Sequence, residues 1–285
     1  KEIAYRSSLD NLYPLLAEIA YNPKGRNMPV VVYQHGDYPG TRLSTVPAIY
    51  ELAKKGIFGL SVSKRGRDGS AGKGDGFGKE IYEIYDAVEY VKANYATYID
   101  PDNINITGGS GGGMDTFAAI VHFPDYFRVA APFVAPPDLD HWFRQLEPTI
   151  KLLEQYAKSF GGQYAGSWSL FSQIIEGIGG LPSQIPDNYL ARNWVLGAIN
   201  NPYTLIHVFW DDEDGASPSI TQRSFAYLEE TKKLGFTNVH LHYSKRGDKL
   251  RFLHWGVPDN SFVWHYFLPV ILSRSHPVPV LADAG

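Results

Sequence analysis

The sequence has no cysteine among its 285 residues and only two methionines. A chain without cysteine forms no disulfide and offers neither a thiol nucleophile nor a cysteine-ligated metal site. Composition alone leaves the compartment unknown. The absence of cysteine is compatible with an oxidising compartment, and a leader removed before Lys1 would agree with that, so we expect a secreted or periplasmic protein.

Long apolar runs and long basic runs are also absent. No stretch approaches the ~18 consecutive apolar residues of a membrane span, and the formal net charge is −4. We therefore expect neither a membrane span nor a nucleic-acid partner. No G-x-G-x-x-G follows a strand, and the acidic cluster 211–214 lacks the spacing of a calcium loop. These absences argue against a dinucleotide cofactor and against a calcium site.

The rest of the composition is that of an ordinary globular protein, with 44% hydrophobic, 20% charged and 14% aromatic residues. Apolar runs alternate with stretches of helical periodicity, which predicts an α/β fold with a mainly parallel twisted sheet and helices on both faces. The first two strands are expected to be antiparallel. The predicted strands are 2–6, 13–21, 29–34, 57–63, 104–107, 127–134, 204–210 and 239–243, and the predicted helices are 44–55, 79–95, 114–121, 219–234 and 261–273, the last broken at Pro269.

Residues 138–201 interrupt this alternation and are rich in aromatic side chains. We expect a mostly helical insertion, acting as a lid, within one domain of residues 1–285. Most of its aromatic side chains should form its own small core. Trp142 and Trp168 are candidates for contact with substrate, because one or two outward-facing rings suffice to stack on a sugar or an aromatic acyl group.

The most informative stretch is 104–113, which reads Ile-Asn-Ile-Thr-Gly-Gly-Ser-Gly-Gly-Gly. A short strand, a glycine-rich turn around Ser110 and an apolar helix form the nucleophile-elbow pattern G-x-S-x-G. Glycines on both sides let two backbones pass closely while the serine adopts a strained conformation. Ser110 is therefore the predicted nucleophile.

A serine hydroxyl needs an adjacent base and a carboxylate that orients the base. In a fold with this elbow, the order along the chain is serine, acid, histidine. The strand 204–210 runs into Asp211, Asp212, Glu213 and Asp214, and a loop carrying His254 follows the strand 239–243. Both partners are thus present in the expected order.

At this point the chain resembles the α/β-hydrolase superfamily, in the branch of the prolyl oligopeptidase catalytic domain, dienelactone hydrolases and acetyl xylan esterases. Five segments carry the resemblance: 30–36 ending in His-Gly, 63–72, 100–112, the acid loop 211–218 and the histidine loop. They span nearly the whole chain apart from the insertion. The resemblance implies a serine hydrolase with a Ser-His-Asp triad.

The acid loop of that branch reads G-x-x-D-x-x-V-P. Asp214 fits as the acid if Pro218 is the proline, whereas Asp211 replaces the usual glycine and Ser217 the usual valine. These departures leave Asp211 and Asp212 as alternatives. The branch also places a glycine before its histidine, where this chain has Leu253.

His254 is the predicted base among nine histidines, because the triad requires a loop histidine here. His35, His240, His242 and His265 are expected to be structural. The predicted oxyanion hole uses the backbone amides of Gly111 and Asp37, and the resemblance adds the hydroxyl of Tyr38.

Three further residues complete the predicted site. Arg65 and Arg67 could bind a substrate carboxylate or phosphate, although an ion pair with Asp68 or a helix end is the simpler expectation. Trp255, beside His254, is a third candidate for substrate contact.

These residues predict a cofactor-independent serine esterase, acting on acylated carbohydrate or aromatic acid esters. Esters are preferred to peptides because the chain leaves no room for the propeller that screens peptides in prolyl oligopeptidase relatives. One alternative is a peptidase or amidase with the same triad. Another is a glycan-binding module that keeps the scaffold without catalysis.

Overall fold

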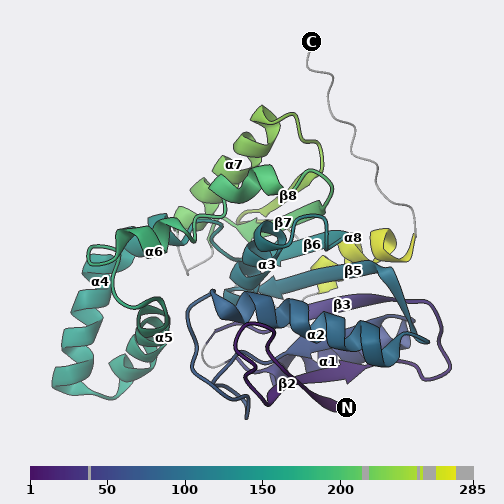
Figure 1. Cartoon of the computed structure of the whole chain (residues 1–285). Coiled ribbons are helices and arrows are strands. Elements are labelled where there is room, and N and C mark those ends of the chain that lie inside the picture. Colours follow the sequence, from purple (N-terminus) through teal and green to yellow (C-terminus); the bar gives the residue numbers. More distant parts are fainter. Residues whose placement is uncertain (38–39, 214–217, 249–250, 253–260, 274–285) are drawn as a thin grey trace.

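A mixed sheet of eight strands forms the centre of the molecule, in the order β1-β2-β4-β3-β5-β6-β7-β8 (Figure 1). The computed structural model describes residues 1–37, 40–213, 218–248, 251–252 and 261–273. The strands are β1 (Glu2–Tyr5), β2 (Leu15–Ala20), β3 (Met28–Gln34), β4 (Phe58–Val62), β5 (Ile99–Gly109), β6 (Val129–Phe133), β7 (Leu205–Asp211) and β8 (Val239–Ser244).

Strand direction follows the prediction. β1 pairs antiparallel with β2, and β2 pairs antiparallel with β4. All pairs from β4 to β8 are parallel. Every residue of β3 is buried, as its continuous apolar run requires of a strand covered on both faces. The α/β class and the parallel sheet are therefore confirmed.

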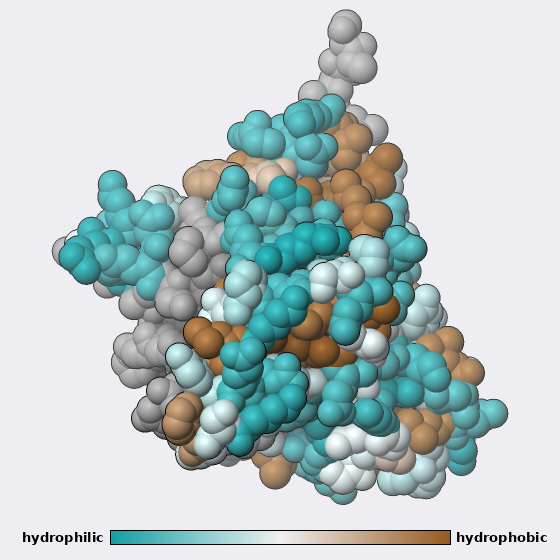
Figure 2. Space-filling model, turned by 90° about the vertical axis from the view of Figure 1, so that its left-hand side faces the viewer, coloured by the Kyte–Doolittle hydropathy of each residue, from teal (hydrophilic) through white to brown (hydrophobic). Residues whose placement is uncertain are grey.

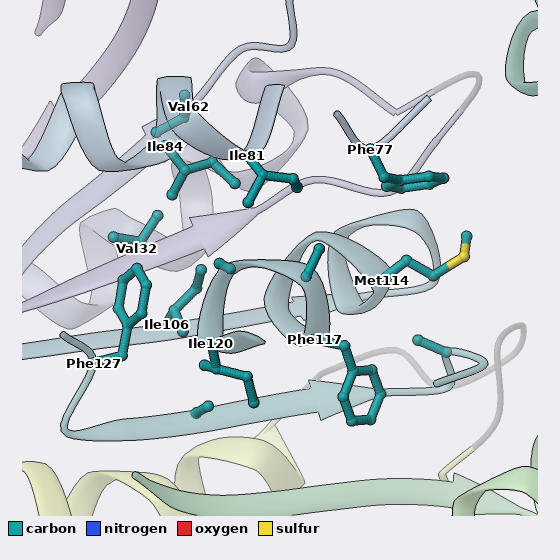
Figure 3. Packing of buried hydrophobic residues seen from close by; sticks show 14 of the residues in the cluster. Val32, Val62, Phe77, Ile81, Ile84, Ile106, Met114, Phe117, Ile120 and Phe127 are labelled. Atoms are coloured by element: carbon teal, nitrogen blue, oxygen red, sulfur yellow. The ribbon is translucent and has the colours of Figure 1, made fainter. Parts of the chain in front are cut away.

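Helices cover both faces of the sheet. α1 (Arg42–Lys54) and α8 (Ser261–Leu272) pack on one face, where Leu52 and Phe267 belong to one apolar cluster. α2 (Lys79–Tyr95), α3 (Gly111–His122) and α7 (Pro218–Lys233) contribute to the larger cluster on the other face. Figure 3 shows Ile84 of α2 and Phe117 of α3 among the side chains of that cluster.

The closing helix α8 differs from the prediction. We expected a break at Pro269, but the helix continues through it. The amide of Ser273 donates to the carbonyl oxygen of Pro269 at 3.0 Å, and Phe267 and Ile271 on either side are fully buried. Packing of these side chains outweighs the one helical hydrogen bond that a proline removes.

Residues between β6 and β7 fold as a helical insertion that projects to one side of the sheet (Figure 1). It contains α4 (Leu139–Phe160), α5 (Gln163–Ile178), α6 (Pro186–Leu190) and a 3₁₀ turn, η1 (Leu196–Asn200). Figure 2 shows this side of the molecule, where hydrophilic side chains surround smaller hydrophobic areas. Its function as a lid stays a prediction.

The insertion has its own aromatic centre, in which Phe143, Tyr189 and Trp194 are buried. Arg192 fastens it to the loop before α2, since its Nε donates to the Gly76 carbonyl at 2.6 Å and its Nη2 to the Asp75 carbonyl at 3.2 Å. Among the described helices, none combines the length and the apolar character needed to cross a bilayer.

Candidate active site

Ser110 stands at the turn between β5 and α3, at the carboxyl edge of the sheet. Its φ of 56° and ψ of −123° fall in a region that side chains other than glycine rarely adopt. The predicted strand, tight turn and helix are thus confirmed, and the serine has the backbone conformation expected of an elbow.

The glycines of this turn are required by close backbone contacts. A Cβ on Gly108 would lie 2.4 Å from the carbonyl oxygen of Gly112, and one on Gly112 would lie 2.3 Å from the carbonyl oxygen of Gln34. Real Cβ atoms do not approach other atoms this closely, so any side chain at either position would displace β3 or α3.

The loop after β3 lies directly against the first residue of α3. A Cβ on Gly111 would lie 2.6 Å from the backbone nitrogen of Asp37 and closer still to its carboxylate. The structure therefore brings together the two residues whose amides were predicted to form the oxyanion hole. Gly111 begins its helix, so its N–H has no acceptor within that helix. Tyr38 lies outside the described residues.

His35 precedes this loop and is buried. Its Nδ1 donates to the carbonyl oxygen of Gly36 at 2.7 Å. Burial and the neighbouring Lys64 lower the pKa of His35 to about 4. A neutral imidazole that donates to backbone has the structural role expected of it.

A buried lysine, which sequence reasoning missed, connects these segments. Lys64 follows β4, and its ammonium lies 2.9 Å from Oδ1 of Asp37 and 3.0 Å from Oδ2 of Asp115 in α3. Burial favours the neutral lysine, but the two carboxylates outweigh it and raise the pKa of Lys64. Burial raises the pKa of Asp115 to about 7 against the opposing effect of Lys64. The sequence signal was an aspartate inside the apolar stretch 114–121.

Two members of the predicted triad, Asp214 and His254, lie outside the described residues, as does Trp255. The alternative acid Asp211 is buried at the end of β7. Its carboxylate accepts hydrogen bonds from Arg251, from the hydroxyl of Ser244 and from the amide of Glu213. Burial alone would raise its pKa, but these donors hold the pKa of Asp211 below its usual value.

The second alternative, Asp212, is exposed and its amide donates to the carbonyl oxygen of Ser244 at 3.0 Å. Asp211 has its oxygens occupied by Arg251 and Ser244, which leaves it no capacity to orient a further imidazole. Of the two described alternatives, only Asp212 keeps a carboxylate open to solvent.

Comparison with known proteins places this geometry in context. Residues 49–160 match the model of the prolyl oligopeptidase family, peptidase S9. An esterase of Pyrococcus furiosus is similar in structure over 97% of this chain and 91% of its own, with a TM-score of 0.69 and 17% sequence identity. The chain has the α/β-hydrolase fold.

Two more solved structures resemble this chain. An acetyl xylan esterase from Paenibacillus sp. R4 is similar over 95% of this chain and 83% of its own length, with a TM-score of 0.64 and 17% sequence identity. An acylaminoacyl peptidase of Pyrococcus horikoshii covers 90% of the chain, at a TM-score of 0.61 and 19% identity, but the chain spans only 37% of that protein. A comparison with curated proteins finds no match.

The two arginines of the predicted site have different surroundings in the structure. Arg65 is buried and pairs with Glu83 of α2 and with Asp10, so its partner is not Asp68, as the sequence suggested. Asp68 instead accepts from the amide of Arg42 at 2.8 Å. With its guanidinium occupied by two carboxylates, Arg65 is a structural residue.

Arg67 lines a cavity of about 210 Å³ between the loop after β4 and α5. Its Nη2 donates to Oε1 of Gln173 at 2.8 Å, and its Nη1 lies 3.9 Å from Asp37. The cavity wall is polar and charged apart from Phe77 and Ile174, and it includes Asp37, Lys64, Arg67, Lys73, Glu80, Gln173 and Glu176. Asp37 thus lines this cavity and also lies against Gly111.

The tryptophans of the insertion are less available than predicted. Trp142 is 7% exposed. Its ring contacts that of Phe143 edge-on and that of Phe171 at a tilt. Because its ring is enclosed by these neighbours, Trp142 belongs to the core and presents no face to a substrate. Trp168 is partly buried against the same cluster. Among the described residues, no three histidine, aspartate or glutamate side chains gather as metal ligands would.

Proposed function

We propose that this hydrolase cleaves carboxylic esters through an acyl-enzyme on Ser110. The observation that carries the proposal is the strained elbow of Ser110 beside the closely placed backbones of Gly111 and Asp37. A nucleophile at the tip of a turn, next to two amides, suits acyl transfer because an oxyanion develops on the carbonyl oxygen as the bond to serine forms.

In the proposed reaction, Oγ of Ser110 attacks the ester carbonyl carbon while its proton passes to Nε2 of His254. The amides of Gly111 and Asp37 donate to the oxyanion. Collapse of the tetrahedral intermediate breaks the bond to the alcohol, which leaves with the proton from His254. Water then repeats the sequence and releases the acid, with Asp214 orienting the imidazole throughout.

The structural neighbours support the ester proposal, since they include the esterase of Pyrococcus furiosus and the acetyl xylan esterase. The polar cavity beside Asp37 favours a hydroxylated substrate such as an acylated carbohydrate, since charged and amide groups can replace the hydrogen bonds of sugar hydroxyls with water. The buried ring of Trp142 gives less support to aromatic acid esters.

The first test uses a panel of p-nitrophenyl esters and acetylated sugars with Ser110→Ala. We expect turnover to fall by at least about 10³-fold, because removal of the nucleophile leaves only binding and the oxyanion hole. A fluorophosphonate probe should label the wild type and not the variant. Ser8→Ala, at an exposed serine, is the matched control.

Undiminished turnover in Ser110→Ala would remove Ser110 as the nucleophile. A wild type that the probe fails to label, but that still binds glycans, would support the non-catalytic alternative.

The second candidate is a peptidase or amidase with the same triad, which the family match over residues 49–160 favours. An ester and an anilide of the same acyl group distinguish an esterase from a peptidase. Each enzymatic kcat/KM is divided by the rate of alkaline hydrolysis of the same substrate without enzyme. A larger normalised kcat/KM for the anilide would favour the peptidase.

A further inference from the structure

The ammonium of Lys64 is enclosed at the carboxyl edge of the sheet, under the turn that carries Ser110. The residue is 5% exposed, and its ammonium also lies 4.9 Å from the centre of the Phe77 ring. A buried charge of this kind is costly unless it is paired with good geometry. Asp37 accepts a hydrogen bond from this ammonium, and Asp115, from a different segment, lies 3.0 Å from it as an ion-pair partner.

These two segments are the ones that carry the predicted oxyanion donors. Asp37 supplies one amide from its own backbone. Asp115 lies four residues after Gly111 in α3, which is about one helical turn. A single ammonium therefore ties the loop after β3 to the first turn of the helix that begins at Gly111.

The distance between the amide groups of Asp37 and Gly111 can change only slightly if both are to donate to one oxyanion. Asp37 and Gly111 lie so close together that a Cβ on Gly111 would be 2.6 Å from the backbone nitrogen of Asp37. Donors to an oxyanion act at about 2.7–3.1 Å, and a misplacement of about 1 Å can cost about 10²-fold in rate. A fixed distance between loop and helix is thus a requirement of the chemistry.

We propose that Lys64 is a positioning residue, which bridges Asp37 and Asp115 and thereby holds the amides of Asp37 and Gly111 at the spacing that an oxyanion needs. This inference rests on the proposed function. It concerns the transition state and the tetrahedral intermediate, because the negative charge on the oxygen develops only there.

The main test is the double variant Lys64→Met with Asp115→Leu, which removes the bridge without leaving Asp115 unpaired and leaves Arg67, 3.9 Å away, as the cation nearest Asp37. We expect kcat to fall about 10- to 100-fold, while KM changes by less than about threefold because ground-state binding is retained. A trifluoromethyl ketone analogue of the substrate should lose affinity by the same factor as kcat/KM.

A second variant, Asp115→Leu alone, keeps the pair of Lys64 with Asp37 and frees only α3. Its kcat should fall by less than that of the double variant, again with little change in KM. If the double variant does not fold, this variant alone tests the proposal. Arg128→Met is the matched control, since Arg128 is a buried cation at the opposite edge of the sheet, where it donates to Asn103. The control should lose thermal stability with kcat unchanged.

Unchanged kcat in folded Asp115→Leu or in the double variant would overturn the proposal. A fall in kcat that simply follows the loss of Tm, with the Arg128→Met control falling alike, would overturn it too. If Ser110→Ala keeps its activity instead, the proposed function fails, and that result is separate from either outcome for Lys64.

Discussion

At the scale of single residues, the glycines around Ser110 show how much the site depends on the absence of a side chain. Gly112 lies against the carbonyl oxygens of both Gln34 and His35. The pattern G-x-S-x-G predicted this contact, because the spacing itself encodes the close passage of helix and strand. Backbone contact is local in sequence and can therefore be predicted.

Gly112→Ala should lower the free energy of unfolding by about 1–3 kcal/mol, the usual cost of overpacking, because the new methyl would meet Gln34 at 2.3 Å. Urea denaturation measures the change. Gly36→Ala is the control, since its Cβ would meet nothing nearer than 3.6 Å. Equal stability of the two variants would contradict the argument.

Partners of buried charges could not be predicted in the same way. The sequence suggested Asp68 for Arg65, whereas Glu83 and Asp10 surround it. Lys64 and Asp115 are 51 residues apart in the chain, and only the packing of α3 against the sheet brings them together. Long-range pairing of this kind is decided by tertiary structure, which no local pattern records.

At the scale of elements, strands and helices could largely be predicted from hydrophobic periodicity. The run 29–34 became β3, and the periodic stretch 79–95 became α2 with the same limits. Pro269 misled the prediction because the packing of Phe267 and Ile271 compensates for a local defect. Local propensity is a weak guide wherever buried contacts can offset it.

The neighbouring strands β7 and β8 carry three stacked imidazoles. The ring of His207 lies 5.2 Å from that of His240 and 5.1 Å from that of His242. Nδ1 of His207 and Nε2 of His242 are 2.8 Å apart. Burial and the adjacent histidines lower the pKa of His207 to about 3 and that of His242 to about 4.

These histidines should make the sheet sensitive to acid. Each folded pKa lies below the ordinary value of about 6.5, so the unfolded chain binds more protons, and stability present above pH 6.5 is lost as the pH falls toward 4. His207→Phe keeps a ring in the stack and should reduce this acid-induced loss by roughly 1–3 kcal/mol. Denaturation of both proteins at pH 7 and at pH 4.5 gives the free energy of unfolding that each loses in acid. An equal loss in the variant and the wild type would refute the assignment.

At the scale of the whole molecule, the helical insertion is joined to the sheet through the loop before α2. Arg192 supplies hydrogen bonds to Gly76 and Asp75, and Lys73 pairs with Glu176 at 3.3 Å. The composition of 138–201 predicted helices and an aromatic core. It could not predict which rings face inward, as the enclosed Trp142 shows.

Arg192→Leu should loosen the insertion while leaving the sheet intact. The change removes the donors to three backbone carbonyls, those of Gly76, Asp75 and Asn188, with a local cost of about 1–3 kcal/mol. We expect faster amide exchange and faster proteolysis within 139–178, with exchange in β3 and β5 unchanged. Arg144→Leu, which breaks only an exposed pair with Asp140, is the control. Uniform acceleration across the whole chain would contradict a local role.

The ion pair between Asp211 and Arg251 has a consequence for the two proposed triad partners. Asp214 follows Asp211 by three residues, and His254 follows Arg251 by three residues. Three residues of fully extended chain reach about 11 Å at most. The ion pair therefore joins the end of β7 to the segment after β8, and Arg251→Met would release that segment while Asp211 keeps its hydrogen bond from Ser244.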